Sequence, residues 1–209
     1  MSAAQAALAR LDEETGAELE NPVSIYIYAT SADLRGAMVF PQEWTGGVAF
    51  TRYGIIAIGI GDNPDDIEWG KRAIAHELTH LVVHQVTFSP YSDIPTWLDE
   101  GLAMNSEGPL QFYFANMLYS AYEDDAFISV RSLSSPFSTD TNKSLLSYAQ
   151  SYELVRYLVN EYGREKMFEL LNTFRQGSGY DEALLTVYGF DMDGLDTLWR
   201  DAYIPVSVN

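Results

Sequence analysis

Two histidines four residues apart, with a glutamate directly after the first, stand in the stretch HELTH at residues 76–80. On an α-helix, four residues advance about 400° and about 6 Å, so His76 and His80 would project from one face, one turn apart. Two imidazoles at this spacing can bind one zinc ion. Glu77 would lie about 100° round from His76, close enough to take a proton from a water on the metal without being a ligand. The pattern therefore predicts a catalytic metal site.

A catalytic zinc ion usually has three protein ligands and one open position, so a third ligand is expected on another element. The stretch WLDEGLA at 97–103 offers Glu100. The nineteen residues 81–99 leave room for the first helix to end, for a loop to reverse the chain and for a second helix to begin. Thr96 is expected to cap that second helix, with Asp99 as its capping-box partner, which leaves Glu100 to project toward the first helix.

The third histidine and the absence of cysteine limit which residues could be metal ligands. His84 lies eight residues after His76, about 12 Å further along a helix axis, which is too far to share one zinc ion. We expect it to serve in packing or to support a ligand. Because the chain has no cysteine, any metal must be held by nitrogen and oxygen.

HELTH followed by WLDEGLA resembles the gluzincin metallopeptidases, the group that contains thermolysin and the aminopeptidase N family, and most closely the compact peptidase-MA-like domains. The resemblance implies that His76, His80 and Glu100 bind zinc and that Glu77 activates the water. The spacing of the two motifs is similar to that of thermolysin, whereas WLDEGLA is similar to the aminopeptidases. With the flanking segments, the resemblance covers about residues 23–203.

Two further stretches extend the resemblance. YAQSYELVRYL at 148–158 is similar to the aminopeptidase segment whose first tyrosine stabilises the oxyanion, which implies Tyr148, with Tyr152 as the alternative. GVAFTRYGIIAIGIGD at 47–62 is similar to the hairpin before the zinc helix of thermolysin-like enzymes. The edge strand of that hairpin binds extended substrate, which implies a substrate-binding backbone at the positions Val48, Ala49 and Phe50.

The chain also departs from the family patterns. The aminopeptidase motif Gly-x-Met-Glu-Asn, which captures a free amino terminus, is absent, since GGVAFTRY carries no acid. An endopeptidase is therefore favoured over an aminopeptidase. Met104 stands where thermolysin-like enzymes have a carboxylate that orients a zinc histidine. Asn105, Glu107 or a backbone carbonyl could take that role.

The elements that must position these residues follow from hydrophobic periodicity and turn residues. In the first half we expect a helix at 3–15, a strand at 23–29 and a short helix at 31–38 that Ser31 caps. A β-hairpin at 47–50 and 54–60 should follow, and then, from residue 68 onward, the helix that carries HELTH. After Pro95 we expect helices at 97–106, 109–123, 145–162, 164–176, 180–187 and 193–202. Residues 129–143, rich in Ser, Thr and Asp, are expected to form a long irregular loop.

This order of elements predicts an α+β, zincin-like fold, in which a small N-terminal β-sheet with the active-site helix precedes a mostly helical C-terminal half. We expect one metallopeptidase-like domain over residues 1–209. Its two lobes would be the sheet and zinc helix at about 17–92 and a helical lobe at about 93–205.

Composition excludes some partners. The net charge of −18 should repel nucleic acid and anionic lipid head groups, and no apolar run is long enough to cross a membrane. The first residues are too polar for a signal peptide, so the chain as given is expected to be soluble. An extracellular domain of a longer exported protein stays open as well, and the oligomeric state is not predicted.

The sequence thus favours zinc-dependent hydrolysis of peptide bonds, with a peptide or protein as substrate and Zn2+ as cofactor. The alternative is a non-catalytic gluzincin-fold domain that binds metal or peptide along its edge strand. A third hypothesis, a purely structural helical domain, would leave the histidines as ordinary buried residues.

Overall fold

The computed structural model of the chain describes residues 2–39 and 46–204. The chain forms two compact units, Met1–Val86 and Thr87–Asn209. Most of the described residues are helical, with one small sheet, which confirms the expected α+β class. The expected single domain with two lobes stays a prediction, and residues 1, 40–45 and 205–209 of that range lie outside the described residues.

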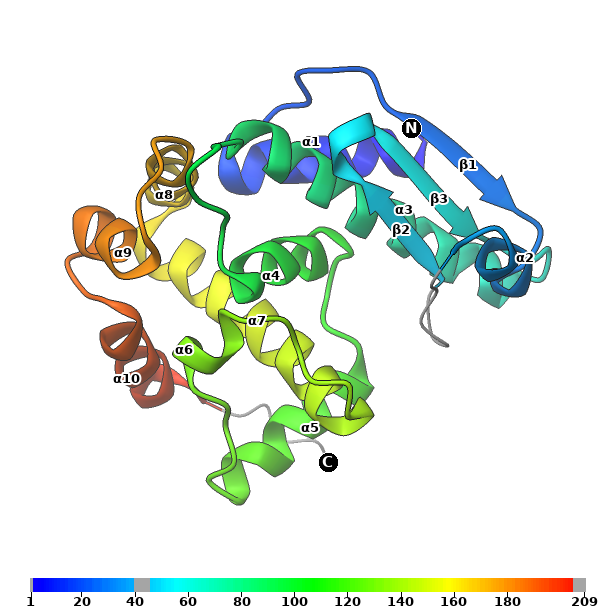
Figure 1. The fold of residues 1–209 in the computed structure, drawn as a ribbon. Coiled ribbons are helices and arrows are strands. Elements are labelled where there is room, and N and C mark those ends of the chain that lie inside the picture. The colour runs from blue at the N-terminus through cyan, green and yellow to red at the C-terminus, as the bar shows by residue number, and fades with distance from the viewer. Residues whose placement is uncertain (1, 40–45, 205–209) are drawn as a thin grey trace. The chain divides into compact units, whose positions relative to one another are not determined.

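The first unit is built on a three-stranded sheet in the order β1-β3-β2 (Figure 1). Strand β1 is parallel to β3, and β2 is antiparallel to it, so β2 is an edge strand. The described elements of this unit in chain order are α1 Ala3–Thr15, β1 Ser24–Tyr28, α2 Ser31–Gly36, β2 Gly47–Phe50, the 3-10 helix η1 Thr51–Tyr53, β3 Ile55–Gly59 and α3 Pro64–Val86.

Strand β3 lies at the centre of this unit because its sequence IIAIG is almost entirely apolar. Ile56 and Ile58 are fully buried. They form one cluster with Ala7 of α1 and with three residues of α3, Ala75, Leu78 and Leu81. Burial of this apolar surface fixes α1 and α3 relative to the sheet.

The helix that carries HELTH begins earlier than the periodicity predicts, at Pro64 instead of Glu68. Asn63 accounts for the early start, because its Oδ1 accepts a hydrogen bond from the backbone N–H of Asp66 at 2.9 Å. A proline in the first turn loses no helical hydrogen bond, and an asparagine before it is a favourable N-cap. The short helix α2 likewise differs by one residue, since Thr30 and not Ser31 caps it.

The second unit is helical throughout its described part. Helix α7 is its centre, because α4, α5 and α8 all pack against it (Figure 1). Its elements in chain order are α4 Thr96–Ser106, α5 Phe112–Glu123, α6 Val130–Leu133, α7 Thr141–Tyr162, α8 Arg164–Arg175, α9 Tyr180–Tyr188 and α10 Met192–Ala202. No helix in the described part of either unit is long and apolar enough to cross a membrane.

The prediction of a long irregular loop at 129–143 is wrong. Ser129 caps the short helix α6, and Asp140 caps α7, which begins at Thr141. Two of the residues that indicated a loop, Ser129 and Asp140, are therefore N-caps, a position where their side-chain oxygens satisfy free backbone N–H groups. Only residues 134–140 between the two helices remain irregular.

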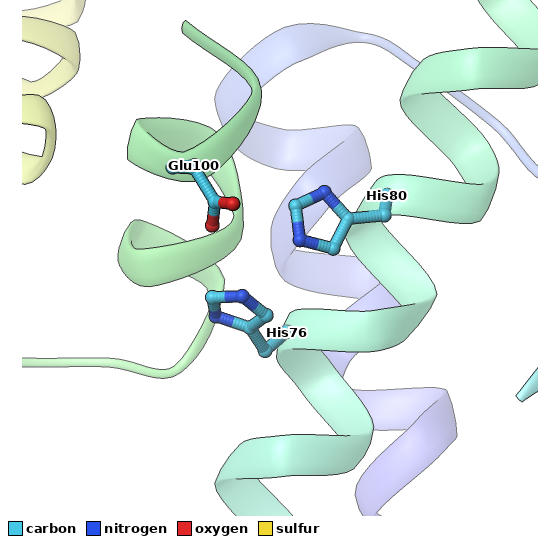
Figure 2. Close-up of side chains that lie close together, drawn as sticks. All are labelled: His76, His80 and Glu100. Carbon is cyan, nitrogen blue, oxygen red and sulfur yellow. The ribbon is translucent and has the colours of Figure 1, made fainter. Parts of the chain in front are cut away.

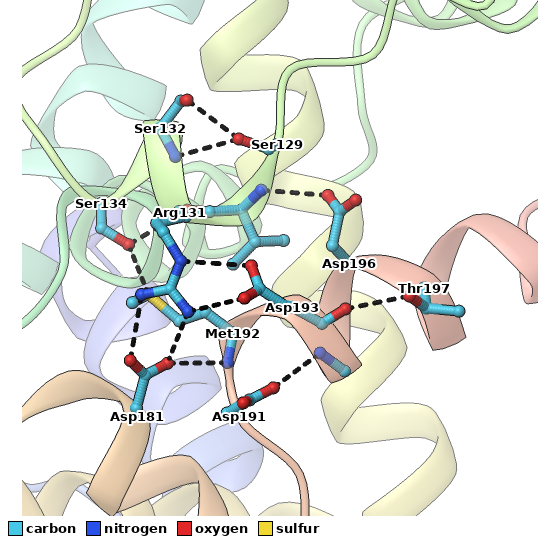
Figure 3. Close-up of polar contacts among 12 residues, drawn as sticks. Ser129, Arg131, Ser132, Ser134, Asp181, Asp191, Met192, Asp193, Asp196 and Thr197 are labelled. Atoms are coloured by element: carbon cyan, nitrogen blue, oxygen red, sulfur yellow. Dashed lines mark hydrogen bonds and ion pairs between the residues drawn. The ribbon is translucent and has the colours of Figure 1, made fainter.

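Arg131 of α6 joins three helices of the second unit (Figure 3). Its guanidinium donates to both carboxylate oxygens of Asp181 on α9, at 3.0 and 3.2 Å, and to both of Asp193 on α10, at 3.1 and 2.9 Å. Asp181 also accepts a hydrogen bond from the backbone N–H of Met192 at 3.1 Å. Such paired contacts fix the geometry of a guanidinium more strongly than single ones.

This network makes stability depend on pH. The hydrogen bonds from Arg131 hold the pKa of Asp181 below its ordinary value, so the stabilisation is present above that ordinary value and is lost as pH falls through the lowered one. We expect Arg131→Gln to lower the urea midpoint at pH 7 and the difference from wild type to shrink below about pH 4. Because the side chain of Asp181 is 42% exposed, salt should reduce the effect.

A suitable control is Lys166→Gln, because the ion pair of Lys166 with Glu169, at 2.8 Å, lies within the single helix α8. A difference between wild type and Arg131→Gln that stays constant from pH 7 to pH 3 would contradict this role for the Arg131 network.

Candidate metal centre

Helix α3 presents His76, Glu77 and His80 on the side away from its buried apolar residues. Leu78, Leu81 and their neighbours fill the core, while His76, Glu77 and His80 are half-buried. The rings of the two histidines are 4.8 Å apart between centroids and meet edge to face, at 78°. The expectation that the two imidazoles project one turn apart from one face is therefore confirmed within the first unit.

Glu100 lies in the second turn of α4, and contacts between α4 and α7 fix its helix. Asn105 donates from its amide nitrogen to the backbone oxygens of Gly101, at 2.8 Å, and of Tyr152 on α7, at 2.9 Å. A Cβ at Gly101 would lie 2.4 Å from the backbone oxygen of Ser151 on α7. The absence of a side chain at Gly101 therefore allows α4 to approach α7 closely, next to Glu100.

The predicted cap of α4 is wrong. Thr96 is the first helical residue, and Pro95 occupies the N-cap position without a side-chain hydrogen bond. The backbone N–H and the hydroxyl of Thr96 both donate to the backbone oxygen of Ser134, each at 3.3 Å. The helix start is thus satisfied by a carbonyl just after α6, which is 38 residues away in the chain.

The two histidines of α3 and Glu100 of α4 make a group that could hold a metal ion (Figure 2). Each of the three residues offers one ligand atom. Two imidazole nitrogens and one carboxylate oxygen are a ligand set that zinc accepts. His84 is no member of the group found among the described residues, as its spacing predicts.

The sequence leaves three candidates for the group that orients a zinc-binding histidine: Asn105, Glu107 and a backbone carbonyl. Asn105 was one candidate, but its amide bonds the two backbone carbonyls described above and joins α4 to α7. Met104 is buried and has no carboxylate. Glu107 or a backbone carbonyl stays a prediction for this role.

The candidate oxyanion donors lie in the third turn of α7 and beyond, because that helix begins at Thr141. Tyr148 is half-buried, whereas Tyr152 is only 7% exposed. The ring of Tyr148 contacts Phe137 edge to face, with 5.1 Å between centroids. Phe137 also lines a cavity of about 770 Å³ in the second unit, with Tyr113 and Met117 of α5 among its other walls. No spacing of residues in the sequence predicts this cavity.

The predicted substrate-binding residues Val48, Ala49 and Phe50 form the edge strand β2, as expected of a hairpin. The backbone N–H of Gly59 donates to the carbonyl of Gly46 at 2.9 Å, and hydrogen-bonded pairs alternate along an antiparallel ladder. The pairs of Val48 and Phe50 with β3 are therefore the hydrogen-bonded ones. Of the three residues, Ala49 points its backbone N–H and C=O to the outer edge, where an extended peptide could pair.

Comparison with known proteins identifies a family. The model of a protein family described as the Peptidase MA superfamily matches residues 3–205, which is nearly the whole chain. No curated protein matches the chain.

The close approach of α4 to α7 can be tested with Gly101→Ala. The added methyl would meet backbone, which cannot rotate away. We expect the free energy of unfolding to fall by about 1–2 kcal/mol, because overpacking outweighs the better helix propensity of alanine. Urea denaturation measures this change.

Gly36→Ala is the matched control, since a Cβ at Gly36 of α2 meets nothing within 4 Å. It should leave stability equal or slightly higher. Equal stability of Gly101→Ala and wild type would show that the approach of α4 to α7 does not require glycine.

Proposed function

The chain belongs to the Peptidase MA superfamily, and from this premise we propose that it is a zinc-dependent peptidase, an endopeptidase more than an aminopeptidase. The family makes it a metallopeptidase-like domain. The observation that carries the proposal is the group of His76, His80 and Glu100, which could hold a metal ion. The donor set is two imidazoles and one carboxylate in a chain without cysteine, and this set suits a catalytic zinc ion with one open position.

The chemistry divides between the metal and the chain. A zinc ion held by these three residues would polarise the peptide carbonyl and lower the pKa of a water molecule toward about 7. Glu77 follows His76 directly on α3 and is half-buried on the same side of the helix. Its carboxylate accepts the proton of the attacking water and then donates it to the nitrogen of the leaving amine.

Two further parts of the chain would act on the substrate. The hydroxyl of Tyr148 donates a hydrogen bond to the oxyanion that develops on the former carbonyl oxygen. We favour Tyr148 over Tyr152 because its side chain is the more exposed of the two. Strand β2 offers the backbone of Ala49 at its outer edge, and an extended peptide can add to such an edge. The lack of an acid in GGVAFTRY favours internal peptide bonds over amino termini.

The proposal predicts different effects for the base and for a ligand. Glu77→Gln should retain stoichiometric zinc but lose hydrolysis by about 10²–10⁴-fold, since it keeps the shape of the side chain and removes the base. His80→Ala should lose both zinc and hydrolysis. Elemental analysis and cleavage of a proteome-derived peptide library measure the two quantities.

Full cleavage by zinc-loaded Glu77→Gln would rule out this mechanism. Stoichiometric zinc in wild type with no cleavage of any peptide would instead favour the non-catalytic binding domain.

The oxyanion role is tested by Tyr148→Phe, with Tyr152→Phe as the matched control on the next turn of α7. Loss of one such donor costs about 10²–10³-fold in kcat, so we expect this loss for Tyr148→Phe at unchanged zinc content. Tyr152→Phe should stay within a few-fold of wild type. The reverse order of the two variants would transfer the role to Tyr152.

A further inference from the structure

The first residue of the edge strand β2 faces the carboxylate of Glu77. A Cβ placed on Gly47 would lie 2.9 Å from Oε1 of Glu77, 3.3 Å from its Cγ and 3.4 Å from its Cδ. All three nearest atoms belong to the one side chain. The end of the Glu77 side chain thus occupies the space next to Gly47. Both residues belong to the first unit.

The residues near Gly47 do not share its close approach to Glu77. Ala49 is two residues further along β2 and on the same face. Its methyl group packs against the core cluster that contains Ile56 and Ile58 of β3, so this face of β2 accommodates a Cβ two residues from Gly47. A Cβ at Gly46 would meet the ring of Trp69, at 2.4 Å, and not Glu77. Of these two glycines, only Gly47 has Glu77 as the side chain that limits it.

We propose that Gly47 is a positioning residue for Glu77: the missing side chain at the start of β2 leaves the space in which the carboxylate of Glu77 is held for proton transfer. The inference rests on the proposed function, in which Glu77 is the base. Gly47 itself touches no substrate through a side chain and acts only through Glu77.

The clash that a methyl at position 47 creates can be relieved in one way at low cost. A Cβ contact under 3.0 Å requires a shift, and the end of a glutamate side chain moves far more easily than a strand or a helix. The carboxylate of Glu77 would therefore turn away while β2 and α3 stay in place. A displacement of about 1 Å in a catalytic group can cost about 10²-fold in rate, whereas the fold would barely change.

The test is Gly47→Ala in the full chain, with zinc content, unfolding free energy, kcat and KM measured on a peptide that wild type cleaves. We expect kcat to fall by about 10–100-fold, with KM within about threefold of wild type and with zinc content and stability unchanged. A purely structural role would lower stability and would not separate kcat from KM. A crystal structure of Gly47→Ala should show the Glu77 carboxylate displaced and the backbone of β2 in place.

Two glycine variants serve as controls. Gly36→Ala adds a methyl group to open space in the same unit, and Gly46→Ala adds one that meets Trp69. Both should keep the wild-type kcat. An unchanged kcat in Gly47→Ala, an equal loss in Gly46→Ala, or failure of Gly47→Ala to fold would each overturn the inference.

The inference can fail without the proposed function. If Glu77→Gln abolishes hydrolysis and Gly47→Ala does not lower it, Glu77 is the base but does not depend on Gly47. If Glu77→Gln hydrolyses peptides as wild type does, the proposed function fails, and the inference fails with it.

Discussion

The packing of α3 against β3 determines where the reactive side chains of the first unit lie. Ala75, Leu78 and Leu81 are buried with the isoleucines of β3, and the helical period then leaves His76 and His80 on the other side. The same packing places the start of β2 beside Glu77. One apolar interface therefore holds the two histidines, the proposed base and the edge strand in a fixed relation.

In the second unit, the corresponding constraint is the contact of α4 with α7. Gly101 lets the two backbones approach, and Asn105 bonds a carbonyl of each helix. Glu100 precedes Gly101 directly, so its direction from α4 depends on this contact. Tyr148 is on α7 itself, which means that the proposed ligand and the proposed oxyanion donor are held by the same pair of helices.

Features that depend on local spacing could be predicted from the sequence, and those that depend on distant contacts could not. The α+β class, the hairpin and the face shared by His76 and His80 follow from periodicity and turn residues. The cap of α4 was predicted wrongly because its partner, Ser134, is 38 residues away. The approach of Gly47 to Glu77 and of Gly101 to Ser151 depends on packing between elements, for which a single sequence carries no direct signal.

In the proposed function, one zinc ion is bound by His76, His80 and Glu100. Anomalous diffraction at the zinc absorption edge, on crystals grown with zinc, tests it most directly because the peak locates the metal without assumptions about activity. We expect one strong peak bonded to these three side chains, with no bond to His84. A peak bound by other residues, or no peak at these three at full zinc loading, would contradict it.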